Sequence, residues 1–234
     1  MNNIFERTEL LLGKEAIKKL SKSKVAVFGV GGVGGHAIEA LARSGIGELH
    51  IIDSDKVCAS NINRQIIATN ETIGKYKVDV MEDRLHTINP NIKVYKYPFF
   101  YLPETKDSIH FSEFDYIVDA IDTITAKIDI IMNAKELNIP IISAMGCGNR
   151  LDPTKLLITD IYKTKNDPLA KVMRHELKKR NIKKLTVVSS NELPIKPLVE
   201  IRGDNNKVIP GSTSFVPSCA GLIIASHVIK ELIK

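Results

Sequence analysis

The sequence contains no tryptophan and only three cysteines. Cys58, Cys147 and Cys219 are odd in number and far apart, which excludes a disulfide framework and is typical of the reducing cytoplasm. No CxxC pair occurs, so a structural zinc site of that kind is not expected. The longest apolar run near the C-terminus, residues 219–225, is too short to cross a bilayer. The N-terminus carries acids early and lacks a signal-peptide pattern, so we expect a cytoplasmic protein with no membrane partner.

The composition is that of an ordinary globular protein, with 44% hydrophobic and 26% charged residues. A length of 234 residues fits one α/β domain with an embellishment. The formal net charge of +6 permits an anionic partner such as nucleic acid, but a lysine-rich protein without such a partner has the same composition. No internal repeat or linker is evident, so we treat residues 1–234 as a single domain.

Residues 24–65 contain the pattern around which the rest of the chain is organised. An apolar run at residues 25–28 leads into a glycine cluster, a helical segment follows, and a second apolar run at residues 49–52 ends on Asp53. This order predicts a strand, a tight turn, a helix and a parallel strand, the first half of a nucleotide-binding fold. Glycines let the backbone approach a phosphate, and the helix N-terminus offers free N–H groups to an anion. The glycines assigned to the nucleotide are Gly29, Gly31, Gly32 and Gly34.

Strand-like and helix-like segments alternate along most of the chain. They predict an α/β fold, a Rossmann-like and mostly parallel sheet with helices on both faces. Residues 24–146 are assigned to the nucleotide-binding core, and residues 147–234 to a substrate-side extension with a C-terminal strand and helix. The last helix is predicted over residues 218–232, with Leu222, Ala225 and Ile229 on its apolar face. The predicted strands are 25–28, 49–52, 93–97, 115–121, 141–145, 156–162 and 185–189; the predicted helices include 8–20, interrupted at Gly13, 125–138 and one that opens at Asp167 and Pro168.

Three acidic residues follow two of the predicted parallel strands. Asp53 and Asp55 come after the second strand, and Asp122 follows the strand that ends near residue 121. Ligands of open α/β sheets bind outside the carboxyl ends of the strands, so these acids are expected to converge. Asp53 suits the ribose hydroxyls, and Asp122 suits a magnesium ion that the phosphates also hold. The alternative is that each acid only caps the next helix.

Two cations in the following segment distinguish this pattern from that of a dehydrogenase. Arg64 and Lys77 lie on the loop and helix after the second strand, where a dehydrogenase needs no such charge. An enzyme that attacks the α-phosphate of ATP must stabilise charge on phosphoryl oxygens, the usual task of Arg, Lys and Mg²⁺. Ser60, Asn61 and Asn63 supply short polar groups beside them. Each cation taken alone could equally be a solvated surface residue.

The helix after Pro168 is rich in basic residues, which recur all around it rather than along one stripe. Clustered positive charge attracts a phosphate backbone, but most charge runs are solvated faces, and both interpretations stay open. The candidate RNA contacts are Arg174, Lys178, Lys179 and Arg180. The cysteines are candidates for covalent catalysis, although burial in an unreactive form is the more common fate.

The motifs GVGGVGG, DSDKV, SNINRQ, GKYKV and DAIDT, in this order, resemble those of the ATP-dependent enzymes that adenylate carboxylates. That superfamily includes the ubiquitin-activating enzymes and the adenylyltransferases of sulfur carrier proteins. The resemblance implies an acyl-adenylate mechanism and a homodimer in which an N-terminal arginine, here Arg7, reaches the partner's site. It implies catalytic roles for Arg64, Lys77, Asp122 and Arg7. It also implies an ATP site made of Gly29, Gly31, Gly32, Gly34, Asp53, Asp55, Ser60, Asn61, Asn63, Arg64, Lys77, Asp122 and Thr123.

The second half of the chain narrows the resemblance. The segments MGCGNRLDPTKL, KNDPLAKVMRHELKK and GSTSFVPSCAGLIIASHVIKEL are similar to those of the tRNA threonylcarbamoyladenosine dehydratases. The implied reaction is ATP-dependent dehydration and ring closure of that nucleoside next to the anticodon, with Mg²⁺ as cofactor. A sulfur-relay protein remains an open partner. One departure is Gly35, where this family more often has serine; glycine keeps the loop permissive.

Three other functions compete with this one. An adenylyltransferase for the C-terminal glycine of a sulfur carrier shares the nucleotide site, but such enzymes commonly carry two CxxC pairs. A nicotinamide-dependent dehydrogenase leaves Arg64, Lys77 and the SNINR segment unexplained. A nucleotide-sensing module without turnover would make the Arg–Lys–Asp set incidental.

Overall fold

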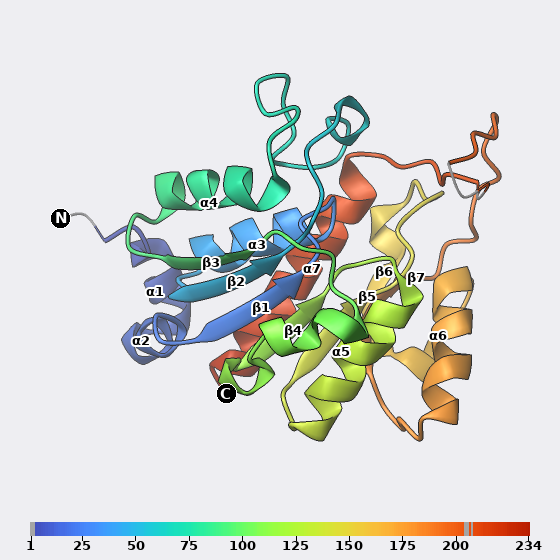
Figure 1. The fold of residues 1–234 in the computed structure, drawn as a ribbon. Coiled ribbons are helices and arrows are strands. Elements are labelled where there is room, and N and C mark those ends of the chain that lie inside the picture. Colours follow the sequence, from blue (N-terminus) through green and yellow to red (C-terminus); the bar gives the residue numbers. More distant parts are fainter. Residues whose placement is uncertain (1–2, 204–205, 207) are drawn as a thin grey trace.

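The computed structural model describes residues 3–203, 206 and 208–234. Seven strands form one sheet in the order β3-β2-β1-β4-β5-β7-β6, and β6 alone runs antiparallel to its neighbour (Figure 1). Both predicted parts of the chain contribute to this sheet. The strands are β1 (Lys24–Phe28), β2 (Glu48–Ile52), β3 (Lys93–Tyr97), β4 (Tyr116–Asp119), β5 (Ile141–Ala144), β6 (Leu156–Asp160) and β7 (Thr186–Ser190).

The strand order reverses between β1 and β4. The chain runs outward from β1 to β3, then returns to β4 on the other side of β1 and continues to β5 and β7. In such sheets the crevice at the reversal, outside the carboxyl ends of the strands, is where ligands bind. The predicted Rossmann-like, mostly parallel sheet is confirmed.

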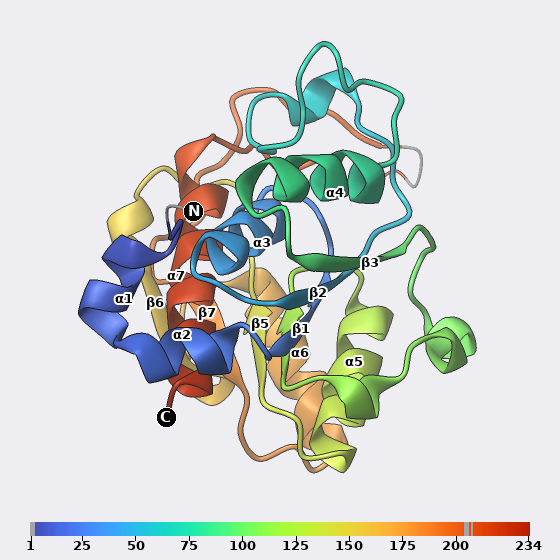
Figure 2. The same cartoon turned by 90° about the vertical axis from the view of Figure 1, so that its left-hand side faces the viewer.

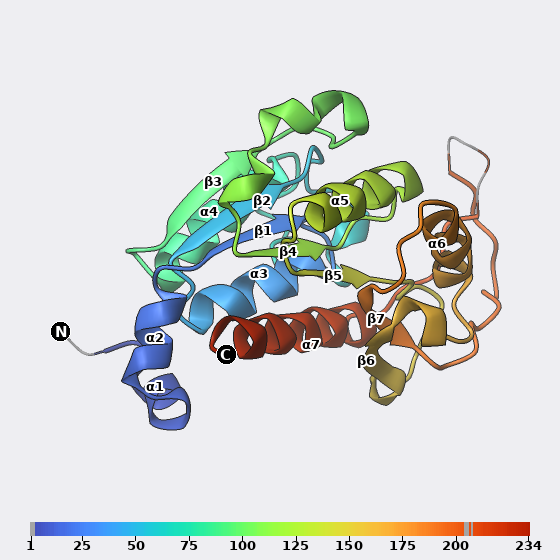
Figure 3. The same cartoon turned by 90° about the horizontal axis from the view of Figure 1, so that it is seen from below.

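Two apolar layers cover the two faces of the sheet. Val25 and Val27 of β1 point to one layer and Ala26 and Phe28 to the other, as the alternation of side chains along a strand requires. In Figure 3, α3 and α7 lie side by side on the first face, while α5 and α6 cover the opposite one. The helices are α1 (Glu6–Leu12), α2 (Lys14–Leu20), α3 (Gly34–Arg43), α4 (Lys77–Ile88), α5 (Ile124–Glu136), α6 (Pro168–Lys179) and α7 (Phe215–Leu232).

The C-terminal helix α7 is long and apolar enough to cross a membrane by length and composition. In the fold it packs along α3 and the sheet, where a Cβ at Gly221 would lie 2.3 Å from the Val33 carbonyl oxygen. Only glycine allows the two helix backbones to cross this closely. Ala225 and Ile229 are buried as predicted, but Leu222 is 52% exposed, so its assignment to the apolar face is wrong. The buried set is Val216, Pro217, Ala220, Gly221, Ile224, Ala225, Val228 and Ile229.

Most predicted elements are present, with errors at their ends. The helical segment before β1 is divided at Gly13 into α1 and α2, and α2 lies beside α7 in Figure 2. Strand β6 ends two residues before its predicted end, because the Asp160 carboxylate accepts from Tyr162 N and starts a 3₁₀ turn. The Asp167 carboxylate caps α6 by accepting from Ala170 N, as predicted. Residues 98–114, without a predicted structure, form 3₁₀ turns whose aromatic residues join the core layer under α5.

Candidate active site

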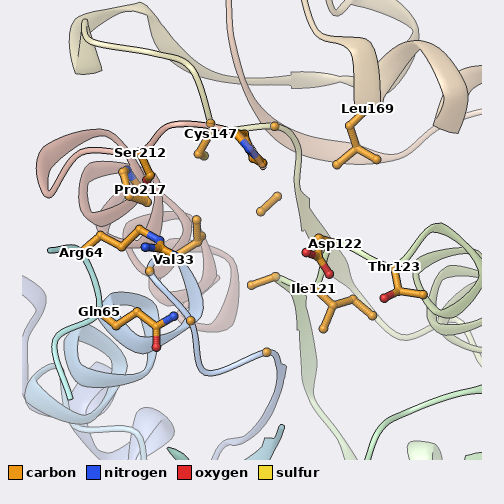
Figure 4. A pocket seen from close by; sticks show the side chains of 18 of the residues that line it. Val33, Arg64, Gln65, Ile121, Asp122, Thr123, Cys147, Leu169, Ser212 and Pro217 are labelled. Carbon is orange, nitrogen blue, oxygen red and sulfur yellow. The ribbon is translucent and has the colours of Figure 1, made fainter. Parts of the chain in front are cut away.

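A cavity of about 770 Å³ opens at the carboxyl ends of β1, β2, β4 and β5. In Figure 4, Arg64 and Gln65 from the segment after β2 lie on one wall, and Asp122 and Thr123 after β4 lie on another. Cys147, from the loop after β5, lies farther along the same cavity. Ten of the residues predicted to bind ATP therefore line one space: Gly29, Gly31, Gly32, Asp53, Asp55, Asn61, Arg64, Lys77, Asp122 and Thr123.

In the glycine turn after β1, Gly29 and Gly34 have no space for a side chain, whereas Gly31 faces open space. A Cβ at Gly29, whose φ is 95°, would lie 2.7 Å from the Ala120 carbonyl oxygen, and one at Gly34 would lie 1.8 Å from the Gly29 carbonyl oxygen. Gly34 lies outside the cavity, and its role is to let α3 start against the turn. A Cβ at Gly31 would lie within 4 Å of one atom of the described residues other than its chain neighbours, Gln65 Nε2, so a ligand can approach this backbone.

Asp53 is fixed at the end of β2 by the backbone. Its Oδ2 accepts from Val30 N at 2.7 Å and its Oδ1 from Asp55 N at 2.8 Å. Burial raises the pKa of the Asp53 carboxyl, and the Lys77 ammonium only partly opposes that effect. The carboxylate is thus rigid and joined to the glycine turn through Val30. Because each of its oxygens has a second lone pair, it can still accept from a hydroxyl of a bound ligand.

Lys77 lies at the start of α4 with its side chain buried against two carboxylates. Its Nζ donates to Asp55 Oδ2 at 2.7 Å and lies 3.7 Å from Asp53 Oδ2. The backbone brings the three residues together, since Lys77 N donates to the Asp55 carbonyl oxygen. An ammonium has three donors, so Lys77 retains capacity for a further acceptor in the cavity.

The Arg64 side chain is held in position by hydrogen bonds to residues of its own loop. One terminal nitrogen donates to the Ser60 carbonyl oxygen and to Asn63 Oδ1, both at 2.8 Å, and the side chain lines the cavity. Ser60 and Asn63 themselves lie outside the cavity, so the structure gives them the task of holding Arg64 rather than facing a nucleotide. Asn61 lines the cavity and is buried. Its Oδ1 accepts from Cys58 N, which fixes the turn that precedes Arg64.

Asp122 projects into the cavity just after β4, next to Thr123, which precedes the first residue of α5. Beneath this loop, the fully buried Lys127 donates to the carbonyl oxygens of Ile121 at 3.0 Å and Ala144 at 2.9 Å. Asp122 offers a single carboxylate as a ligand in this part of the open cavity. A single carboxylate suits an ion that is bound mainly by phosphate oxygens, as Mg²⁺ commonly is, rather than by a cage of protein ligands.

The loop after β5 forms the other half of the cavity. Gly146 N donates to Asp167 Oδ2 at 3.0 Å, which ties this loop to the start of α6. Burial raises the pKa of the Cys147 thiol to about 12, and the nearby Asp167 carboxylate adds to the effect. Cys147 is therefore a neutral thiol near pH 7, as the interpretation of the cysteines as unreactive predicted for this residue.

The remaining predicted residues lie away from the cavity. Arg7 is exposed on α1 and does not reach the cavity of its own chain. On α6, Arg174 donates to Thr164, and Lys179 and Arg180 pair with Glu176 of the same helix. Of the candidate RNA contacts, only Lys178 is exposed without an ion-pair partner among the residues that the structure describes. The first residues of α6, Pro168 and Leu169, line the cavity, so this basic helix starts at its edge.

Three buried polar residues of the site were not predicted. Gln65 lines the cavity and its Oε1 has no hydrogen-bond partner in the described structure. Lys127 lies under the Asp122 loop, and Arg150 lies in the wall of the second half of the cavity. Gln65 directly follows Arg64, and Lys127 is a charged residue within an otherwise apolar helix face, so both left a signal in the sequence. Arg150 left none, because an arginine in a polar loop is usually solvated.

Three comparisons with known proteins place the chain in the same family. Residues 5–234 match the model of the ThiF family. The tRNA threonylcarbamoyladenosine dehydratase of Bacillus subtilis is 44% identical, over 98% of this chain and 94% of that protein. Crystal structures of the Escherichia coli tRNA N6-threonylcarbamoyladenosine dehydratase in complex with AMP and with ATP are 33% identical, with TM-scores of 0.89 and 0.87. Each match covers 98% of this chain and 93% of that one.

Proposed function

Because this chain belongs to the ThiF family and, within it, to the tRNA threonylcarbamoyladenosine dehydratases, we propose that it uses ATP to dehydrate threonylcarbamoyladenosine in tRNA. The observation that carries the proposal is the single cavity in which the glycine turn, Asp53, Arg64 and Asp122 meet. The cavity continues past Asp122 to the loop after β5, which leaves room for a second substrate. A dehydrogenase site gives no reason for the preset Arg64.

The first step is adenylation of the free carboxylate of the threonylcarbamoyl group. A carboxylate oxygen bonds to the α-phosphorus of ATP, and the bond from that phosphorus to pyrophosphate breaks. Negative charge grows on the phosphoryl oxygens, where fixed cations lower the barrier. Arg64 is held for this task by Ser60 and Asn63, and Lys77 by Asp55. Asp53, locked to Val30 N, orients the ribose of ATP, and the open backbone at Gly31 accommodates a phosphate.

The second step is ring closure within the substrate. A nucleophilic atom of the same side chain attacks the acyl carbon and loses its proton, and AMP leaves with one oxygen of the former carboxylate. The net change in the nucleoside is loss of one water. The reacting groups belong to one side chain, so the site supplies proximity and water exclusion rather than an enzyme nucleophile. The neutral, partly buried Cys147 thiol agrees with a mechanism that needs no thiolate.

We extend the proposal to Mg²⁺, for which Asp122 with Thr123 is the protein side of the site. When bound, the ion would neutralise phosphate charge as the α-phosphorus is attacked. For the tRNA, we propose that the exposed cations of α6, Lys178 foremost, attract the phosphate backbone beside the cavity. Binding through phosphates should weaken steeply with salt, which a titration at increasing ionic strength would measure.

We further propose a cytoplasmic homodimer. Leu10 and Leu11 on α1 are 81% and 87% exposed, and Arg7 lies one helical turn before Leu11 on the same helix. An exposed apolar pair next to an arginine suits a contact through which Arg7 enters the partner's cavity. Light scattering should give twice the mass of the chain, 26.0 kDa, and a smaller value for Leu11→Glu. A sulfur-relay protein remains a partner to search for by pull-down.

The decisive experiment uses the purified protein, ATP, Mg²⁺ and tRNA that carries threonylcarbamoyladenosine. Mass spectrometry of digested nucleosides should show loss of one water, with equal amounts of AMP and pyrophosphate released and no reaction without ATP. If the nucleoside stays unchanged while the C-terminal glycine of a sulfur carrier protein becomes adenylated, the competing adenylyltransferase function replaces this one.

A further inference from the structure

Arg150 is a buried cation without a charged partner. The residue is 2% exposed, and its one side-chain hydrogen bond to the described residues runs from Nη2 to the Asn166 carbonyl oxygen at 2.6 Å. Nε and Nη1 have no partner in the described structure, and no carboxylate oxygen of the described residues lies within 4 Å of the guanidinium. The other buried cations of the site differ, because Lys77 pairs with Asp55 and Lys127 with Asp119.

The carboxylate of Asp167, which follows Asn166 in the chain, does not neutralise Arg150. Asp167 is buried close by, but its Oδ1 accepts from Ala170 N, and its Oδ2 accepts from Gly146 N and Ser189 Oγ. These bonds fix Asp167 as the cap of α6 and the anchor of the loop after β5. An arginine that is desolvated without a counter-charge costs free energy, and buried charges in proteins are normally paired. The guanidinium thus has unmet capacity for an anion.

The backbone that carries Arg150 is held in place. The preceding residue, Asn149, has a φ of 57°. Three hydrogen bonds hold it to Ile195 and Gly211, in the segment between β7 and α7. Asn149 N donates to the Gly211 carbonyl oxygen and Gly211 N to Asn149 Oδ1, both at 2.7 Å, while Ile195 N donates to the Asn149 carbonyl oxygen at 2.9 Å. A side chain that leaves from such a fixed point is preorganised, which is what a binding residue requires.

The position of Arg150 in the cavity indicates which anion it can bind. The nucleotide groups, Asp53 and Arg64, follow β2, and Asp122 follows β4. Arg150 follows β5, one strand further along the sheet, so Asp122 separates it from the ribose side of the cavity. If ATP occupies the β1–β2 side, the remaining anion of the reaction, the carboxylate to be adenylated, must enter from the β5 side. A guanidinium fork matches a carboxylate in two parallel hydrogen bonds.

We infer that Arg150 binds the carboxylate of the threonylcarbamoyl group and presents it to the α-phosphate of ATP. The inference rests on the proposed function and adds to it the residue that recognises the modified nucleoside. Arg150 explains how the enzyme distinguishes tRNA that carries this group from tRNA with unmodified adenosine. The α6 cations, which meet only the phosphate backbone, would bind both tRNAs equally.

The test compares Arg150→Gln and Arg150→Lys with the matched control Arg84→Gln, which removes an arginine that is paired with the buried Glu39 and does not line the cavity. Binding of modified and unmodified tRNA is measured in the presence of AMP, together with KM, kcat and Tm. Arg150→Gln should raise KM about 10- to 100-fold and lose most of the preference for modified tRNA, since a hydrogen bond to a charged group is lost. Arg150→Lys should recover part of both.

Stability separates a binding role from a structural one. Removal of an unpaired buried charge should leave the Tm of the free enzyme unchanged or higher for Arg150→Gln. Arg84→Gln should lower Tm and leave KM unchanged. The inference is overturned if Arg150→Gln keeps the wild-type preference for modified tRNA, or if it lowers Tm while KM stays the same. If the wild-type enzyme itself leaves the nucleoside unchanged, the proposed function fails instead, and the carboxylate assignment fails with it.

Discussion

Lys127 and Asp119 form an ion pair in which both side chains are fully buried, with Lys127 Nζ 2.9 Å from Asp119 Oδ2. Ser143 Oγ donates to the same carboxylate oxygen at 2.5 Å, and Lys127 also donates to the carbonyl oxygens of Ile121 and Ala144. These bonds join the carboxyl ends of β4 and β5. The two loops that start there carry Asp122 and Arg150, so the pair sets the distance between the two halves of the cavity.

We predict that Lys127→Met lowers the free energy of unfolding by about 3–5 kcal/mol, because it leaves Asp119 buried without its partner. Urea denaturation followed by circular dichroism measures the loss. The double variant Lys127→Met/Asp119→Asn is the control, since removal of both charges should recover much of the stability. A double variant that is no more stable than Lys127→Met would show that the ion pair is not the source of the effect.

The ion pair also shows which parts of the site could be predicted from the sequence and which could not. Asp53 and Asp122 were placed at one edge of the sheet because apolar runs that lead to an acid are visible in the sequence, and parallel strands bring such ends together. The predicted end of the 115–121 strand was wrong, because β4 ends at Asp119 and Asp122 lies in the loop that follows. The partnership of Lys127 with Asp119 was not found. It depends on which face of α5 meets the sheet, and a single lysine beside Ile128 does not reveal that.

The two adjacent glycines at the start of α3 have opposite tolerance for a side chain. We predict that Gly34→Ala weakens ATP binding at least about tenfold and lowers Tm, because its Cβ would lie 1.8 Å from the Gly29 carbonyl oxygen and the turn must shift. Gly35→Ala is the control, since its nearest neighbours would be Ile66 Cγ2 at 3.4 Å and Met81 Cε at 3.5 Å. Calorimetric titration with ATP compares them. Wild-type affinity in Gly34→Ala would contradict the proposed role of the turn.

Arg64→Ala should lower kcat about 10²- to 10³-fold, the usual cost of losing one fixed group that stabilises transition-state charge. The affinity for tRNA should change little, because Arg64 lies on the nucleotide wall and is held by Ser60 and Asn63. Single-turnover kinetics and tRNA binding measure the two effects separately. The kcat of Arg64→Lys, which keeps the positive charge but lacks the planar guanidinium, should fall between those of the wild type and Arg64→Ala. Equal losses in turnover and tRNA affinity would place Arg64 at the wrong ligand.

Longer-range packing explains what else the sequence did not reveal. Leu222 fits the apolar spacing of α7, yet it is exposed because the close crossing with α3 at Gly221 turns a different stripe inward. Arg150 differs from a solvated arginine only through burial, which is a property of the folded chain. The sequence predicted the nucleotide wall, where a local motif fixes the geometry. It did not predict the β5 wall, where residues distant in the sequence meet.

Cys147 should be inert as long as the protein is folded. Its pKa is raised to about 12, so iodoacetamide at pH 8 should modify the exposed Cys58 and spare Cys147, as peptide mass spectrometry would show. An unfolded chain ionises this thiol near its ordinary value of 9.0, well before the folded protein does. The contribution of Cys147 to stability should therefore fall as pH rises from 9 to 12, and Cys147→Ala should reduce that fall while it retains turnover. Rapid alkylation of Cys147 at pH 8, or loss of turnover in Cys147→Ala, would instead assign the thiol a place in the reaction.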